Sequence, residues 1–251
     1  MTLVPTFTAD YPGALVIPAN LDNVYAPAGH GGVPNRPRAF IIHTPEEAAD
    51  NNEVTPRWFQ QYHPDMRGST HYYQDNDGDV YQMVPEAWGA IANGFNPGIP
   101  QRLSYPAWAG PFSLNWQTLS VEVEGHAHNI GQTLNNTQFQ ALVKLVRHRC
   151  SAYGIPLDRE HVMGHYQLAV DRSDPGAGFP WPAFIEALQQ EDDMAITVAA
   201  CGNSPSGFRI YALGGGAPAW ITRKEEADEL IRVFGQPKAL SWATLVALGA
   251  R

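Results

Sequence analysis

Short runs of hydrophobic and polar residues predict a sheet of brief strands in the first half of the chain. Residues 38–43 form an apolar run that ends at His43, which is typical of a buried strand with a polar tip. Residues 71–74 and 79–84 are rich in strand-forming residues, and the Asp-Asn-Asp-Gly turn at 75–78 tolerates positive φ. We therefore predict a buried strand followed by a β-hairpin.

A further strand is predicted at residues 119–124, where apolar and polar residues alternate strictly. Because side chains alternate across a strand, the two sets must lie on opposite faces. We expect a buried face of Leu119, Val121 and Val123, and an opposite polar face of Ser120, Glu122 and Glu124.

Helical periodicity follows in the second half of this region. Apolar residues recur at helical spacing from Phe139 to Cys150, with Asn136 or Thr137 as a candidate N-cap and Gly154 as the terminator. A shorter helix is predicted at about 182–188. The longer helix is expected to cover the sheet.

Charge and composition divide the chain into three parts. Residues 1–37 are rich in Pro and Gly and predict an extended arm, or a strand or two, that packs over the first domain. Residues 38–193 are strongly acidic and form the predicted main domain, whereas residues 194–251 are mildly basic. In this small C-terminal domain we expect helices at about 222–234 and 241–248.

Composition excludes several classes of function. The net charge is −9 and basic residues form no run, which argues against a nucleic-acid partner. No stretch approaches 18 apolar residues, so we expect no integral membrane association. No signal peptide is recognisable, so we expect the protein to accumulate in the cytoplasm. The two cysteines lie in unrelated contexts, so any metal must be held by histidine and carboxylate.

Candidate ligands are spread along the chain. His43 ends a predicted strand, His165 follows Gly164, and Asp174 precedes a Pro-Gly turn. Two imidazoles and a carboxylate make up a ligand set found in catalytic zinc sites. His126 and His128 offer a competing pair if they lie on a strand, although the flanking residues favour a surface loop.

Six ordered motifs between residues 38 and 190 resemble those of zinc-dependent N-acetylmuramoyl-L-alanine amidases, of the type related to bacteriophage amidases and peptidoglycan recognition proteins. The motifs are Ile41-Ile42-His43-Thr44, Ser69-Thr70-His71-Tyr72, Ala107-Trp108-Ala109-Gly110, Ser120-Val121-Glu122-Val123-Glu124-Gly125, Gly164-His165 and Ser173-Asp174-Pro175-Gly176. The resemblance implies an α/β fold with a mixed central β-sheet flanked by helices and a zinc-binding groove, followed here by the small C-terminal domain.

The resemblance also implies roles for individual residues. It makes His43, His165 and Asp174 the ligands of a Zn²⁺ cofactor, and Glu122 the catalytic carboxylate, with Glu124 as the alternative if the strand register is shifted. Arg172 stands where relatives commonly carry lysine, so we expect it to stabilise an oxyanion but not to transfer a proton. The residues expected to contact substrate are Thr70, His71 and Trp108.

The implied activity is zinc-dependent hydrolysis of the amide between N-acetylmuramic acid and L-alanine in bacterial peptidoglycan. We expect a phage or prophage endolysin that degrades the cell wall after release from the host cytoplasm, and the C-terminal domain could then bind the wall. A cytosolic amidase that recycles muropeptides and a non-catalytic peptidoglycan-recognition protein are the alternatives. Oligomeric state is not predicted by the sequence.

Overall fold

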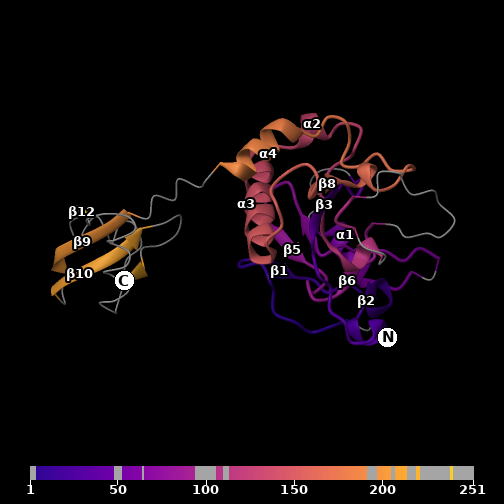
Figure 1. Cartoon of the computed structure of the whole chain (residues 1–251), viewed down its shortest axis with the longest axis horizontal. Coiled ribbons are helices and arrows are strands. Elements are labelled where there is room, and N and C mark those ends of the chain that lie inside the picture. The colour runs from indigo at the N-terminus through magenta and orange to yellow at the C-terminus, as the bar shows by residue number, and fades with distance from the viewer. Residues whose placement is uncertain are drawn as a thin grey trace. The chain divides into compact units, whose positions relative to one another are not determined.

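A computed structural model describes most of the first 190 residues and four strands beyond them (Figure 1). The described residues are 4–47, 53–63, 65–93, 106–109 and 113–190, together with the backbone of 197–204, 207–213, 219–220 and 238–239. Contacts between residues divide the chain into two compact units, Met1–Gln189 and Gln190–Arg251.

A six-stranded mixed sheet forms the centre of the first unit. The hairpin strands are antiparallel to each other, and the remaining neighbours in the sheet are parallel. In spatial order the strands are β1 (Leu15–Val16), β5 (Val80–Gln82), β4 (Tyr72–Gln74), β7 (Thr118–Val123), β3 (Ala39–His43) and β8 (Val162–Gly164). The predicted mixed sheet is thus confirmed, including the hairpin and the strand that ends at His43.

The polar face predicted on β7 is largely buried. Ser120 is fully buried and Glu124 is 2% exposed. The cause is the position of β7 in the middle of the sheet, between β4 and β3, with structure on both faces. Only Glu122 on this face keeps intermediate exposure.

Among the described residues of the first unit, the sheet is accompanied by α1 (Val54–Gln60), α2 (Ile130–Thr133), α3 (Asn136–Tyr153) and α4 (Trp181–Gln189). Helix α3 begins one residue earlier than the predicted caps allow, because the Asn135 side-chain oxygen accepts from the Gln138 N–H at 2.9 Å. Gly154 ends the helix in the left-handed conformation, as expected.

Apolar side chains pack on both faces of the sheet. On one face, α3 and α4 cover Phe40, Ile42, Leu119 and neighbouring strand residues, and Phe184 of α4 is fully buried there. On the other face, Phe59 of α1 packs with the hairpin and the N-terminal segment. Helices therefore cover both faces of the sheet, and the carboxyl ends of its strands are left to form a site.

Short elements tie the N-terminal segment to the sheet. Strand β1 pairs with β5, while β2 (Val24–Tyr25) pairs with β6 (Gly89–Ala90). Single turns of 3₁₀ helix are η1 (Leu21–Asn23), η2 (Pro27–His30), η3 (Leu114–Trp116) and η4 (His165–Gln167). Part of the predicted arm is therefore an edge strand of the central sheet.

The second unit contains a four-stranded sheet that the sequence patterns did not predict. Its order is β11 (Ala219–Trp220), β10 (Gly207–Leu213), β9 (Thr197–Ser204) and β12 (Lys238–Ala239). The helices predicted at 222–234 and 241–248 lie outside the described residues. Across the described parts of both units, every helix is too short or too polar to cross a lipid bilayer.

Candidate metal centre

Parallel strands bring three predicted site residues to one edge of the sheet. His43 is the last residue of β3 and lies beside Glu122 of β7 in the strand register. His165 follows β8, the neighbour of β3 on the other side. Carboxyl ends of parallel strands are where α/β sheets commonly place their ligands, and the same topology operates here.

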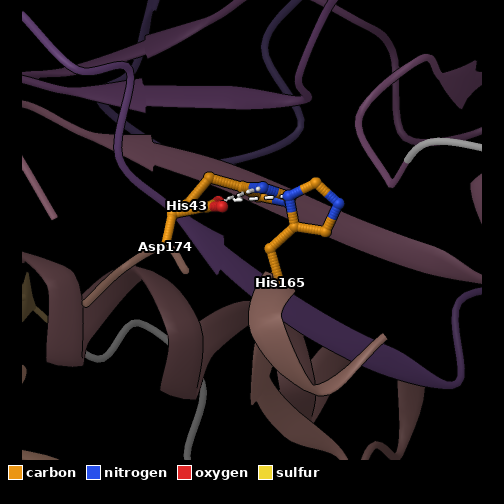
Figure 2. Close-up of side chains that lie close together, drawn as sticks. All are labelled: His43, His165 and Asp174. Atoms are coloured by element: carbon orange, nitrogen blue, oxygen red, sulfur yellow. Dashed lines mark hydrogen bonds and ion pairs between the residues drawn. The ribbon is translucent and has the colours of Figure 1, made fainter. Parts of the chain in front are cut away.

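Asp174 completes a cluster with the two histidines (Figure 2). Its Oδ2 atom lies 3.0 Å from His43 Nδ1 and 3.2 Å from His165 Nδ1. The imidazole rings have their centroids 4.5 Å apart. Ligand atoms of a tetrahedral zinc site stand about 3.4 Å from one another, so this spacing suits a single metal ion.

The single hydrogen that a neutral His43 ring carries also supports a metal ion at this cluster. Its Nε2 lies 3.2 Å from Asn93 Oδ1, and its Nδ1 faces the Asp174 carboxylate. Both neighbours are acceptors, but a neutral imidazole carries only one N–H. Burial, followed by the nearby His165, lowers the pKa of His43, so the neutral form is favoured. With Nε2–H donating to Asn93, the Nδ1 lone pair can take a cation.

Asn93 was not predicted as a site residue. Its side-chain N–H donates to Thr118 Oγ1 at 2.7 Å, which turns the amide oxygen toward His43. The backbone N–H of Asn93 is held in turn by Asn115 Oδ1 at 2.9 Å. Asn93 lies in an aperiodic segment, so no sequence pattern signalled that it would meet His43.

The carboxylate of Asp174 is held in its charged form. Burial would raise the pKa of Asp174, but the contacts with His165 and His43 outweigh it and lower the pKa below its ordinary value. An anionic oxygen beside two imidazoles is a complete set of three protein ligands. The His165 atom that faces Asp174 is Nδ1, while its Nε2 is buried without a hydrogen-bond partner among the described residues.

Glu122 lies at the same edge of the sheet but has different electrostatics. Burial, and then the negative charges of Asp174, Glu47 and Glu46, raise the pKa of Glu122 well above its usual value, and Arg172 lowers it in part. Its Oε2 atom is buried with no hydrogen-bond partner in the described part of the chain. A carboxyl group whose pKa is raised in this way can serve as a general base and then as a general acid.

A groove of about 550 Å³ opens onto this cluster. It is lined by the three ligand candidates and Glu122, and by Trp58, Arg67, Arg172 and residues from the segments between them. The Arg172 side chain is half exposed, with its Nε 3.9 Å from Asp171. The groove thus contains the candidate metal ligands, a carboxyl group of raised pKa and a permanent positive charge.

Two of the three residues expected to bind substrate are enclosed elsewhere. Thr70 and His71 are at most 1% exposed. Thr70 Oγ1 donates to Ser120 Oγ at 2.9 Å, and His71 Nδ1 lies 3.1 Å from the same oxygen. Their side chains brace β4 against β7 and are not among the residues that line the groove.

Trp108 also lies apart from the groove. Its indole N–H donates to the Glu160 carbonyl at 2.8 Å, and the ring lines a different cavity together with Arg36 and Arg38. A substrate contact of Thr70, His71 or Trp108 thus has no support in the described conformation.

Glu124, the alternative catalytic carboxylate, is hydrogen-bonded outside the groove. Its Oε2 accepts from the Asn76 N–H at 2.8 Å, which leaves Glu122 as the strand carboxylate that lines the groove.

Comparison with known proteins agrees with this geometry. Residues 33–177 match the family described as N-acetylmuramoyl-L-alanine amidase. A search of curated proteins finds no match.

Among solved structures, a selenomethionine derivative of AmpD is similar at 21% identity, with a TM-score of 0.51, covering 71% of this chain and 95% of that one. The endolysin N-acetylmuramoyl-L-alanine amidase LysCS from Clostridium intestinale URNW is 16% identical, with a TM-score of 0.50 and coverage of 72% and 98%. These two likenesses concern the fold, while the family match covers more than half of the sequence. The chain therefore belongs to the N-acetylmuramoyl-L-alanine amidase family.

Proposed function

We propose that this amidase is a zinc enzyme that cleaves the bond between N-acetylmuramic acid and L-alanine, with His43, His165 and Asp174 as its metal ligands. The observation that carries the proposal is the convergence of three ligand atoms on one point, beside a buried carboxyl group of raised pKa. Histidine and carboxylate ligands suit zinc, and three of them leave a coordination position open.

Residues of the chain transfer the proton and stabilise the developing charge. When bound, zinc supplies Lewis acidity and lowers the pKa of water toward about 7. Glu122 accepts the proton of the attacking water, and its raised pKa lets it keep that proton until the C–N bond breaks. It then returns the proton to the leaving amine of L-alanine. Arg172 lines the groove and donates to the developing oxyanion.

Digestion of purified peptidoglycan tests this proposal. We expect new L-alanine amino termini in the mass spectrum, their loss after treatment with a chelator, and their return when zinc is restored. Asp174→Ala should lose the zinc ion held by His43 and His165 and lose activity with it, while Glu160→Gln, which changes an exposed carboxylate outside the groove, should retain both. Activity that survives complete removal of metal would refute the zinc mechanism.

We further propose that the biological role is lysis of the cell wall by a phage or prophage endolysin. The similarity to LysCS, named as an endolysin, supports this role, and a wall-binding function of residues 190–251 would suit a polymeric substrate. A cytosolic amidase that recycles small muropeptides is the alternative role. Release of termini from intact sacculi, compared with soluble muropeptides, separates the two roles.

A further inference from the structure

A second group of potential metal ligands lies at the rim of the groove. It consists of Glu46, His126 and His128, whose candidate ligand atoms all lie within 4.8 Å of one another. The sequence pointed to the two histidines as a pair, but Glu46 is distant from them along the chain. The tertiary structure supplies the third ligand.

Glu46 is held in place by contacts of one carboxylate oxygen. Its Oε1 accepts from Thr44 Oγ1 at 2.9 Å and from the Ala127 N–H at 2.8 Å. The other oxygen, Oε2, faces His126 Nδ1 at 3.6 Å, which is too long for a hydrogen bond but close to the spacing of two ligands on one zinc ion, about 3.4 Å. Hydrogen bonds that orient a ligating carboxylate are a general property of metal sites.

The backbone at Glu46 adds an independent observation. Glu46 has φ of 58°, and it is the one non-glycine residue with positive φ among the described residues. Such a conformation costs free energy and persists where surrounding contacts impose it, often at functional positions. Here it directs the carboxylate toward the histidine turn.

Residues 125–129 bring the two histidines together. Gly125 has φ of 138°, which reverses the chain directly after β7, and the Asn129 N–H donates to the His126 carbonyl at 3.2 Å. The imidazole rings of His126 and His128 have centroids 5.2 Å apart with planes inclined by 38°. His128 and Glu46 are exposed, so small rotations of their side chains can complete a coordination sphere.

We propose that Glu46, His126 and His128 form a second binding site for a divalent metal ion, separate from the catalytic ligands. Two imidazoles and one carboxylate favour Zn²⁺, Co²⁺, Ni²⁺ or Cu²⁺ over Mg²⁺ and Ca²⁺. Because Glu46 also lines the groove, a metal ion here joins the segment after β3 to the turn after β7 at the mouth of the groove.

Metal stoichiometry of the full chain tests the proposal without using activity. The protein is stripped with a chelator and titrated with Zn²⁺ against a chromophoric competitor. We expect two equivalents for the wild type and one for His126→Ala or His128→Ala. His148→Ala, which removes an exposed histidine on α3, should keep two.

Further variants separate the two sites. Asp174→Ala should retain one equivalent, and the double variant Asp174→Ala/His128→Ala should bind none. Glu46→Gln keeps an oxygen that can accept from Thr44 and Ala127 but loses the anionic ligand, so it should weaken the second equivalent at least tenfold. If the catalytic ligands are wrongly assigned, Asp174→Ala will bind as many zinc ions as the wild type. The His126 and His128 variants test the second site separately, so the two proposals can be distinguished.

A spectroscopic measurement on the wild type avoids dependence on variants. Titration with Co²⁺ should give visible absorption bands that grow through two equivalents and stop. A wild type whose single equivalent is lost in Asp174→Ala, or a His128→Ala protein that binds as many ions as the wild type, would overturn the proposal and leave these three side chains as a polar cluster only.

Discussion

The protonation of one histidine ring decides whether the cluster at the sheet edge can accept a metal ion. His43 must place its hydrogen on Nε2, and Asn93 is the acceptor that fixes it there. Thr118 in turn orients the Asn93 amide. A residue outside the ligand set therefore prepares a ligand, as is common in metal sites.

Replacing Asn93 tests this dependence. Asn93→Ala removes the acceptor for His43 Nε2–H, so we expect zinc affinity at the catalytic site to fall about 10- to 100-fold. Competition with a chromophoric chelator measures the change. Asn93→Asp retains an acceptor oxygen and serves as the matched variant, for which affinity should recover. Equal affinities of wild type and Asn93→Ala would show that the hydrogen bond does not prepare the ligand.

Glu122 can be tested apart from metal binding, because it is not among the proposed ligands. Glu122→Gln removes the proton acceptor but preserves the shape of the side chain. We expect kcat to fall by about 10²- to 10⁴-fold while the zinc content stays unchanged. Steady-state kinetics together with metal analysis would check both parts. A kcat within a few-fold of wild type would show that another group acts as the base.

At the scale of elements, the loop that follows β7 packs directly against the turn that carries Asp174. Gly176 has φ of 99°, and a Cβ atom there would lie 1.9 Å from the Ala127 carbonyl oxygen. Gly131 also approaches Gly178 closely, with 2.5 Å between its notional Cβ and the Gly178 carbonyl oxygen. Absence of side chains at both contacts lets the two segments meet beside the metal ligand.

Gly176→Ala should therefore destabilise the protein and lower its zinc affinity, since Ala127 or Asp174 must move. We expect a loss above the roughly 1–2 kcal/mol that a left-handed alanine costs. Gly154→Ala is the matched control: it has φ of 65° with no atom within 4 Å, so it should pay only the conformational cost and keep its zinc. Urea unfolding and metal titration measure the two effects, and similar losses in both variants would contradict the packing argument.

At the scale of the whole molecule, a buried histidine couples the fold to pH. Burial lowers the pKa of His71, against smaller opposing effects of the Trp88 carbonyl, Glu86 and Asp10. The folded state keeps the ring neutral, whereas the unfolded chain takes up a proton below about pH 6.5. Stability is therefore greatest above that pH and decreases as the pH falls.

His71→Gln should flatten this dependence. In chelated protein, we expect the wild type to lose up to about 1.4 kcal/mol per pH unit from this one proton between pH 6.5 and 5.5, and the variant to lose correspondingly less. Urea unfolding at pH 7.5, 6.5 and 5.5 gives the slopes. His128→Gln, which removes an exposed histidine, controls for the number of histidines. Parallel slopes for wild type and His71→Gln would refute the assignment.

The sequence by itself determined the strand that ends at His43, the hairpin, the strand that carries Glu122, the long helix and three of the residues that meet at the sheet edge. Those features follow from local periodicity and from motifs that a family shares. The buried polar face of β7 could not be predicted, because alternation tells which residues share a face and not whether a second layer covers it.

Only the tertiary structure decided which polar groups are enclosed and which line the groove. Thr70 and His71 are enclosed, and Trp108 donates to the Glu160 carbonyl outside the groove. Asn93 meets His43, and Glu46 meets His126. Each of these pairs joins segments far apart in the chain. Long-range contacts arise from how strands and loops are ordered in space, a property that patterns of neighbouring residues do not encode.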